Sequence, residues 1–105
     1  MTDVFIAGIG MTNLGKFVAK SVKDLTRDAV NSAPSDCGAK IDDIEAAWFS
    51  NTRQGLLEGQ NAIRGQCALR PLGFEEIPIT NIENACASGS SALLQAVAHI
   101  RAGMC

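Results

Sequence analysis

The chain has 105 residues, of which 47% are hydrophobic, so it is long enough to bury the core of one modest domain. Nine basic residues stand against eleven acidic ones, and the formal net charge at pH 7 is -2. Because no run of basic residues occurs, the sequence gives no indication of a nucleic acid or an anionic membrane surface as a partner.

The cysteines are widely spaced and include no CxxC pair, which argues against a zinc centre or a thioredoxin-like redox site. The four are Cys37, Cys67, Cys86 and Cys105. No basic segment precedes the first apolar run, as it would in a secretory signal, so we expect free thiols in a reducing compartment. We therefore expect no metal, no bound cofactor, no membrane span and a cytoplasmic location, or a peroxisomal one in a eukaryote.

The first predicted element is a strand at residues 4–9. This stretch is a continuous apolar run closed by Gly10, which is typical of a strand buried on both faces of a parallel sheet. Gly8, Gly10 and Gly15 could suggest a nucleotide-binding loop, but the third glycine of the dinucleotide fingerprint is missing and no GK[ST] follows. The glycines are better explained by a turn and close strand packing.

A first helix is predicted to begin after Ser21. Ser21 and Asp24 have the spacing of a capping box, and apolar residues then recur at helical intervals. Pro34 should kink or end this helix because it lacks the N-H group that would bond to the carbonyl of Val30. Gly38 is the last position at which the helix should stop.

A second strand is predicted at residues 46–50, which contain the only tryptophan, Trp48. The carboxylates of Asp42, Asp43 and Glu45 precede it. They could indicate a metal site or an acid-base pair, but no histidine accompanies them, so a solvated turn is the better interpretation.

The next stretch is predicted to be a loop followed by a short helix. Residues 51–59 are polar and contain glycines, which indicates a loop beyond the second strand. Residues 61–69 show helical spacing and should end before Pro71.

The last two predicted elements are a strand at residues 77–82 and a helix at residues 87–102, with Cys86 at their junction. The unpaired N-H groups at a helix start carry partial positive charge, which stabilises a thiolate. His99 lies well inside this helix on its polar stripe, where a hydrogen-bonded or solvated histidine is favoured over a catalytic one.

The alternation of strands and helices predicts a parallel, doubly wound α/β fold with the order βαβαβα. In such sheets ligands bind beyond the carboxyl ends of the strands. Cys86 comes directly after the third strand, so the topology indicates it as a candidate nucleophile.

Two stretches also resemble a known family. Residues 84–93 are similar to the nucleophile segment of the thiolase superfamily, and residues 4–12 to its first strand and loop. The similarity extends over the whole chain and is nearest to the sterol-carrier-protein type of thiolase. The first stretch reads Asn84-Ala85-Cys86-Ala87-Ser88-Gly89-Ser90-Ser91-Ala92-Leu93.

The resemblance implies that Cys86 is acylated by an acyl-CoA. A thiolase subunit resembles two tandem copies of a βαβαβαββ unit, with the catalytic histidines, a second cysteine and most CoA contacts downstream of this segment. We therefore expect residues 1–105 to form part of an N-terminal thiolase domain and to be inactive when isolated. The resemblance further implies a homodimer or homotetramer, and Arg53, Arg64 and Arg70 could contact a neighbouring subunit or a CoA phosphate.

The function predicted is thiolytic or condensing acyl transfer through an acyl-cysteine. A β-ketoacyl synthase is an alternative, although Ala87-Ser88-Gly89 departs from the serine-rich pattern of those enzymes. A second alternative is a non-catalytic, thiolase-like scaffold, because none of the 105 residues supplies a family histidine.

Overall fold

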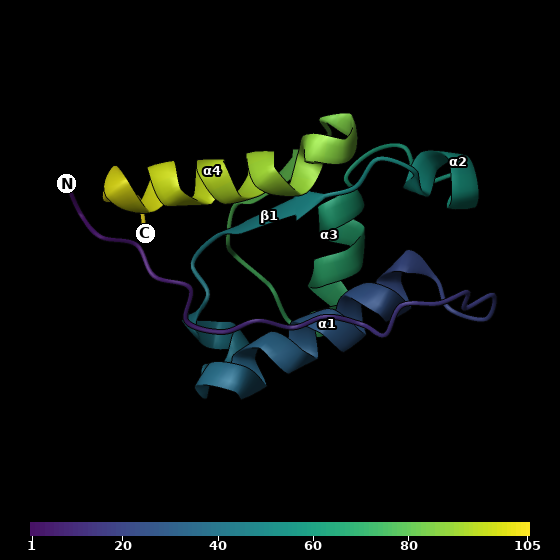
Figure 1. Ribbon diagram of the computed structural model, residues 1–105, viewed down its shortest axis with the longest axis horizontal. Coiled ribbons are helices and arrows are strands. Elements are labelled where there is room, and N and C mark those ends of the chain that lie inside the picture. Colours follow the sequence, from purple (N-terminus) through teal and green to yellow (C-terminus); the bar gives the residue numbers. More distant parts are fainter.

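The computed structural model describes residues 1–105 and contains four α-helices and one two-stranded parallel sheet (Figure 1). No helix is long and apolar enough to cross a membrane. In chain order the helices and strands are α1 (Val22–Cys37), β1 (Ala47–Ser50), α2 (Gln54–Glu58), α3 (Arg64–Leu69), β2 (Ile79–Ile82) and α4 (Ser88–Arg101), with three short 3-10 turns between them.

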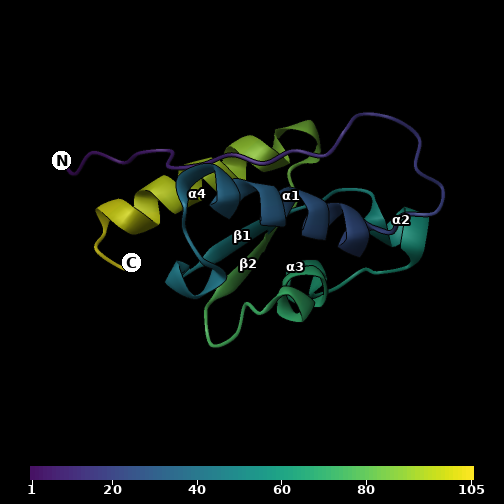
Figure 2. The same ribbon diagram turned by 90° about the horizontal axis from the view of Figure 1, so that it is seen from below.

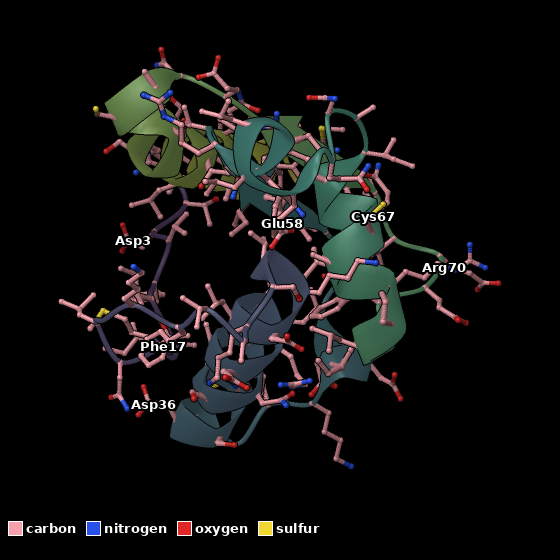
Figure 3. All side chains as sticks on the ribbon, turned by 90° about the vertical axis from the view of Figure 1, so that its right-hand side faces the viewer. Asp3, Phe17, Asp36, Glu58, Cys67 and Arg70 are labelled. Carbon is pink, nitrogen blue, oxygen red and sulfur yellow. The ribbon has the colours of Figure 1, made fainter.

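The start of α1 follows the predicted capping box. The N-H of Asp24 donates to Ser21 Oγ at 3.2 Å, and the Asp24 carboxylate accepts from the N-H of Ser21 at 2.9 Å. A second carboxylate, Glu58 of α2, accepts from the N-H of Val22 at 2.7 Å, and Figure 3 shows Glu58 reaching the first turn of α1. The negative charge of these two carboxylates complements the positive end of the helix. The hydrogen bond of Glu58 also joins α2 to α1.

The end of α1 corrects one expectation. Pro34 does not end the helix, which continues to Cys37 with the proline inside it. The helix stops at Gly38, as predicted, where a φ of 76° places the backbone in the left-handed region and the cap N-H bonds to the Pro34 carbonyl.

The two strands pair in parallel, with Ala47 opposite Ile79 and Ser50 opposite Ile82. Alternate side chains face opposite sides. The Trp48 side faces α4, where its ring meets that of His99 edge-on at 5.0 Å between centroids. The Phe49 side faces α3. Helices therefore cover both faces, with α4 on one side and α1 and α3 on the other (Figure 1), which confirms the parallel, doubly wound α/β class.

The predicted first strand is not formed. Residues 4–9 have no strand hydrogen bonds, and Figures 1 and 2 show this segment running beside α1. The N-H of Ile9 donates to the Asp36 carboxylate at 3.0 Å instead of to another strand. A Cβ on Gly8 would approach the Ala33 carbonyl oxygen to 2.5 Å, so this glycine permits close packing on α1 and not the close strand packing expected from the sequence.

Residues 51–59, predicted to be a loop, include the short helix α2, which ends at Gly59 with a φ of 76°. The short helix predicted at residues 61–69 begins three residues later, because Ile63 is left-handed with a φ of 44°. The chain packs this helix tightly on the sheet through Gly65, where a Cβ would lie 2.7 Å from Phe49 Cβ.

The buried core is small. Ala68, Leu69 and Phe74 are the hydrophobic side chains that it contains. Leu93 and Leu94 of α4 are 54% and 70% exposed, so the chain leaves part of this helix uncovered, as the spread of its apolar residues predicts.

Candidate functional site

The candidate site lies at the carboxyl ends of β1 and β2. Cys86 is the middle residue of a 3-10 turn, η3 (Ala85–Ala87), which joins β2 to α4. Its thiol is free and exposed to solvent. The structure therefore places Cys86 at the predicted strand-helix junction, with α4 beginning at Ser88, one residue later than expected.

The backbone immediately before Cys86 has an uncommon conformation. Ala85 has a φ of 47°, and this left-handed geometry costs an L-residue about 1–2 kcal/mol. Asn84 lies outside the regular regions, with φ -149° and ψ 46°. Left-handed backbone such as that of Ala85 persists only where neighbouring groups hold it, and it concentrates at functional sites.

Two hydroxyl groups contact this turn. Ser88 Oγ, on a residue only 7% exposed, donates to the Ala85 carbonyl at 2.8 Å and accepts from the N-H of Asn84 at 2.7 Å. Thr52, in the segment after β1, places Oγ1 3.1 Å from the same carbonyl and 3.2 Å from Ser88 Oγ. The turn is therefore bound both to its own helix and to the neighbouring strand.

A carboxylate also lies next to the turn that carries Cys86. The Glu83 side chain accepts a hydrogen bond from the N-H of Ala85. Glu83 also lines a cavity of about 170 Å³ at the same sheet edge, together with Asn51, Asn81 and Arg64. Cys86 is not part of the cavity lining, so the thiol faces solvent outside it.

Thr52 and Glu83 are the residues of this site that the sequence motifs do not indicate. Thr52 lies just after Asn51, beyond the end of β1 at Ser50, within residues 51–59, which are predicted only as a loop. The signal that could have indicated it is topological, because the carboxyl ends of parallel neighbouring strands meet at one edge.

His99 is not brought to the site. It lies in the last turn of α4, packed on Trp48, whereas Cys86 precedes the first turn. Eleven residues separate Ser88 from His99, and a rise of 1.5 Å per residue puts them about 16 Å apart along the helix axis. The structure therefore gives His99 a packing role.

The remaining candidates are dispersed. Arg64 donates to the carbonyls of Gln60 and Asn51, both at 2.9 Å, so it holds the chain around α3. Figure 3 shows Arg70 pointing away from the molecule, while Cys67 lies half-buried on α3. Asp43 accepts from the N-H of Lys40 at 2.8 Å, which fits a turn. No group of three or more potential metal ligands occurs in the structure.

Comparisons with known proteins agree on one family. The model of the thiolase N-terminal domain matches residues 4–105. An acetyl-CoA acetyltransferase of Methanocaldococcus jannaschii is 38% identical over 103 residues, which are 98% of this chain and 26% of that protein.

Two animal relatives extend the comparison. Non-specific lipid-transfer protein-like 2 of Caenorhabditis elegans is 41% identical over 93 residues, which are 86% of this chain and 21% of that protein. Human sterol carrier protein 2 is 31% identical over 104 residues, which are 96% of this chain and 18% of that protein. The chain thus spans about a quarter or less of the length of these relatives.

Proposed function

Because this chain belongs to the thiolase superfamily, whose N-terminal domain it matches, we propose that Cys86 is the nucleophile of an acyl-CoA acyltransferase. The observation that carries the proposal is the position of its exposed thiol, which lies beyond the carboxyl ends of two parallel strands and just before α4. The name of the Methanocaldococcus jannaschii relative, acetyl-CoA acetyltransferase, supports an acyl-CoA as the substrate.

The chemistry begins with transfer of the acyl group from the sulfur of CoA to the sulfur of Cys86. The Cys86 thiolate attacks the thioester carbonyl, a sulfur-carbon bond forms, and the tetrahedral intermediate expels the CoA thiolate. The proton of the Cys86 thiol ends on CoA, and the acyl group remains on the enzyme. A second acyl-CoA, as its α-carbanion, or free CoA then takes the acyl group and restores the thiol.

The start of the helical segment suits this step. The backbone N-H of Cys86 is among the first N-H groups of that segment, and these groups lack an intrahelical acceptor. In our proposal this N-H is one donor to the oxyanion, and one such donor typically supplies about 3 to 4 kcal/mol of transition-state stabilisation.

The proposal treats the chain as one part of a thiolase subunit, which associates into a homodimer or homotetramer. The greater length of the relatives supports this view. Groups that move protons from the substrate carbon would then come from chain outside residues 1–105. His99, about 16 Å along the helix from Ser88, is not assigned this task.

Peptide-resolved mass spectrometry after brief incubation of the native protein with acetyl-CoA tests the proposal. We expect one acetyl group on the Cys86 peptide, no acetyl on the other three cysteine peptides, and no acetylation in Cys86→Ser. Equal labelling of Cys37 or Cys105, which are also exposed, would show unselective chemistry and refute the assignment.

The same experiment distinguishes the two alternatives. Faster acylation from an acyl carrier protein thioester than from acetyl-CoA would identify a β-ketoacyl synthase. An unacylated Cys86 that reacts with iodoacetamide no faster than Cys105 would indicate a scaffold.

A further inference from the structure

We propose that Thr52 is a positioning residue that fixes the nucleophile turn relative to the sheet. Its hydroxyl binds the Ala85 carbonyl, one residue before Cys86, and thereby aims the thiol at the acyl carbonyl. The inference rests on the proposed role of Cys86 and adds a residue from a different strand end.

Several donors lie around one carbonyl of the turn. The Ala85 oxygen lies within hydrogen-bond distance of the Thr52 hydroxyl at 3.1 Å and accepts from the Ser88 hydroxyl at 2.8 Å and from the Ser88 N-H. Thr52 Oγ1 also lies 3.2 Å from Ser88 Oγ, and because each hydroxyl has one proton, Thr52 donates either to the Ala85 carbonyl or to Ser88 and is bound to the turn in both cases. The two hydroxyls sit beside the left-handed residue of the turn.

Thr52 differs from the other hydrogen-bond partners of the turn in its distance along the chain. The remaining side-chain hydrogen bonds of the turn join residues no more than seven apart, such as Asn84 and Ser91 at 3.0 Å. These local bonds maintain the shape of the turn. Thr52 is 33 residues from Ala85 and belongs to the segment after β1, so its bond fixes where the turn sits relative to the sheet.

The position of the Cys86 sulfur affects the rate of acyl transfer. An acyl transfer requires the sulfur to approach the carbonyl carbon along a defined direction, and small misplacements lower the rate strongly. Alkylation by iodoacetamide makes no demand on the binding of a thioester. Loss of the Thr52 hydroxyl should therefore slow acylation of Cys86 far more than alkylation.

Thr52→Val removes the hydroxyl with little change in shape. In the native protein we expect it to lower the rate constant of Cys86 acetylation by acetyl-CoA about tenfold, which corresponds to one net hydrogen bond of about 1.4 kcal/mol. Alkylation of Cys86 should change less than about twofold. Thr52→Ser, which keeps the hydroxyl, should acetylate within about threefold of the native rate.

A matched control uses the same substitution elsewhere. Thr26 Oγ1 donates to the Val22 carbonyl at 2.7 Å within α1, so Thr26→Val loses a comparable bond without touching the turn. It should leave acetylation of Cys86 unchanged. Alkylation of the half-buried Cys67 reports general loosening, and it should remain slow in all three variants.

Two results would overturn the proposal: native-rate acetylation in Thr52→Val, or acetylation in Thr52→Ser as slow as in Thr52→Val. Amide hydrogen exchange distinguishes failure of the Thr52 proposal from failure of the proposed function of Cys86. If native Cys86 accepts no acetyl group, the proposed function fails, and exchange at Asn84 still decides the role of Thr52. We expect about tenfold faster exchange in Thr52→Val, whereas an unchanged rate refutes the contact.

Discussion

Gly65 is the residue through which α3 packs on the sheet, and replacing it tests the fold directly. A Cβ at this position would lie 2.7 Å from Phe49 Cβ, 2.8 Å from Ile79 Cγ2 and 2.9 Å from Asn81 Oδ1. Separations below 3.0 Å force the helix or the strands to move. Overpacking of this kind costs about 1–3 kcal/mol, and alanine recovers about 0.5–1 kcal/mol in a helix, so Gly65→Ala should lower the free energy of unfolding by about 1–2 kcal/mol.

Gly89 provides the matched control. It lies in the first turn of α4, and a Cβ there would meet no atom within 4 Å. Gly89→Ala should therefore change only the backbone entropy and raise the free energy of unfolding by at most about 1 kcal/mol. Urea unfolding followed by the fluorescence of Trp48, the only tryptophan, measures both variants. If Gly65→Ala were as stable as Gly89→Ala, the close packing of α3 on β1 and β2 would be refuted.

Two further predictions concern the ends of α1. The pKa of Asp24 is lowered because the backbone N-H and the hydroxyl of Ser21 both hydrogen-bond to its carboxylate, so this stabilisation is present above the unfolded pKa and is lost as pH falls through the lower folded pKa. Acid titration monitored by circular dichroism should show less stability lost below about pH 4 in Asp24→Asn than in the native protein, and identical titrations would contradict this. Gly38→Ala should cost about 1 kcal/mol because φ is 76° at this position, although its Cβ would meet nothing within 4 Å. Gly38→Asn should lose less in the same urea assay, since asparagine tolerates the left-handed region, and equal losses would contradict this backbone explanation.

The elements that the sequence predicts well are those specified by neighbouring residues. The capping box of Ser21 and Asp24 and the stop at Gly38 depend on contacts within one turn of helix, and both are confirmed. The strand at β1 follows from a short apolar run, and the strand at β2 follows from the alternation of apolar and polar residues. Cys86 falls at a strand-helix junction for the same reason.

The elements that the sequence mispredicts depend on partners distant in the chain. Residues 4–9 have the composition of a buried strand, but a strand exists only when another strand supplies its hydrogen bonds, and here the Ile9 N-H goes to Asp36. Pro34 removes one helical bond, yet the helix continues to its glycine cap. Apolar periodicity likewise contains no sign that Ile63 and Ala85 are left-handed.

The sequence by itself therefore determined the local helix signals, the α/β class and the nucleophile candidate, because each depends on residue types at short spacing. Only the tertiary structure brought Thr52 to the Ala85 carbonyl and packed His99 on Trp48. The parallel pairing of β1 with β2 is the physical reason. It places two strand ends, separated by more than thirty residues of chain, at one edge of the sheet.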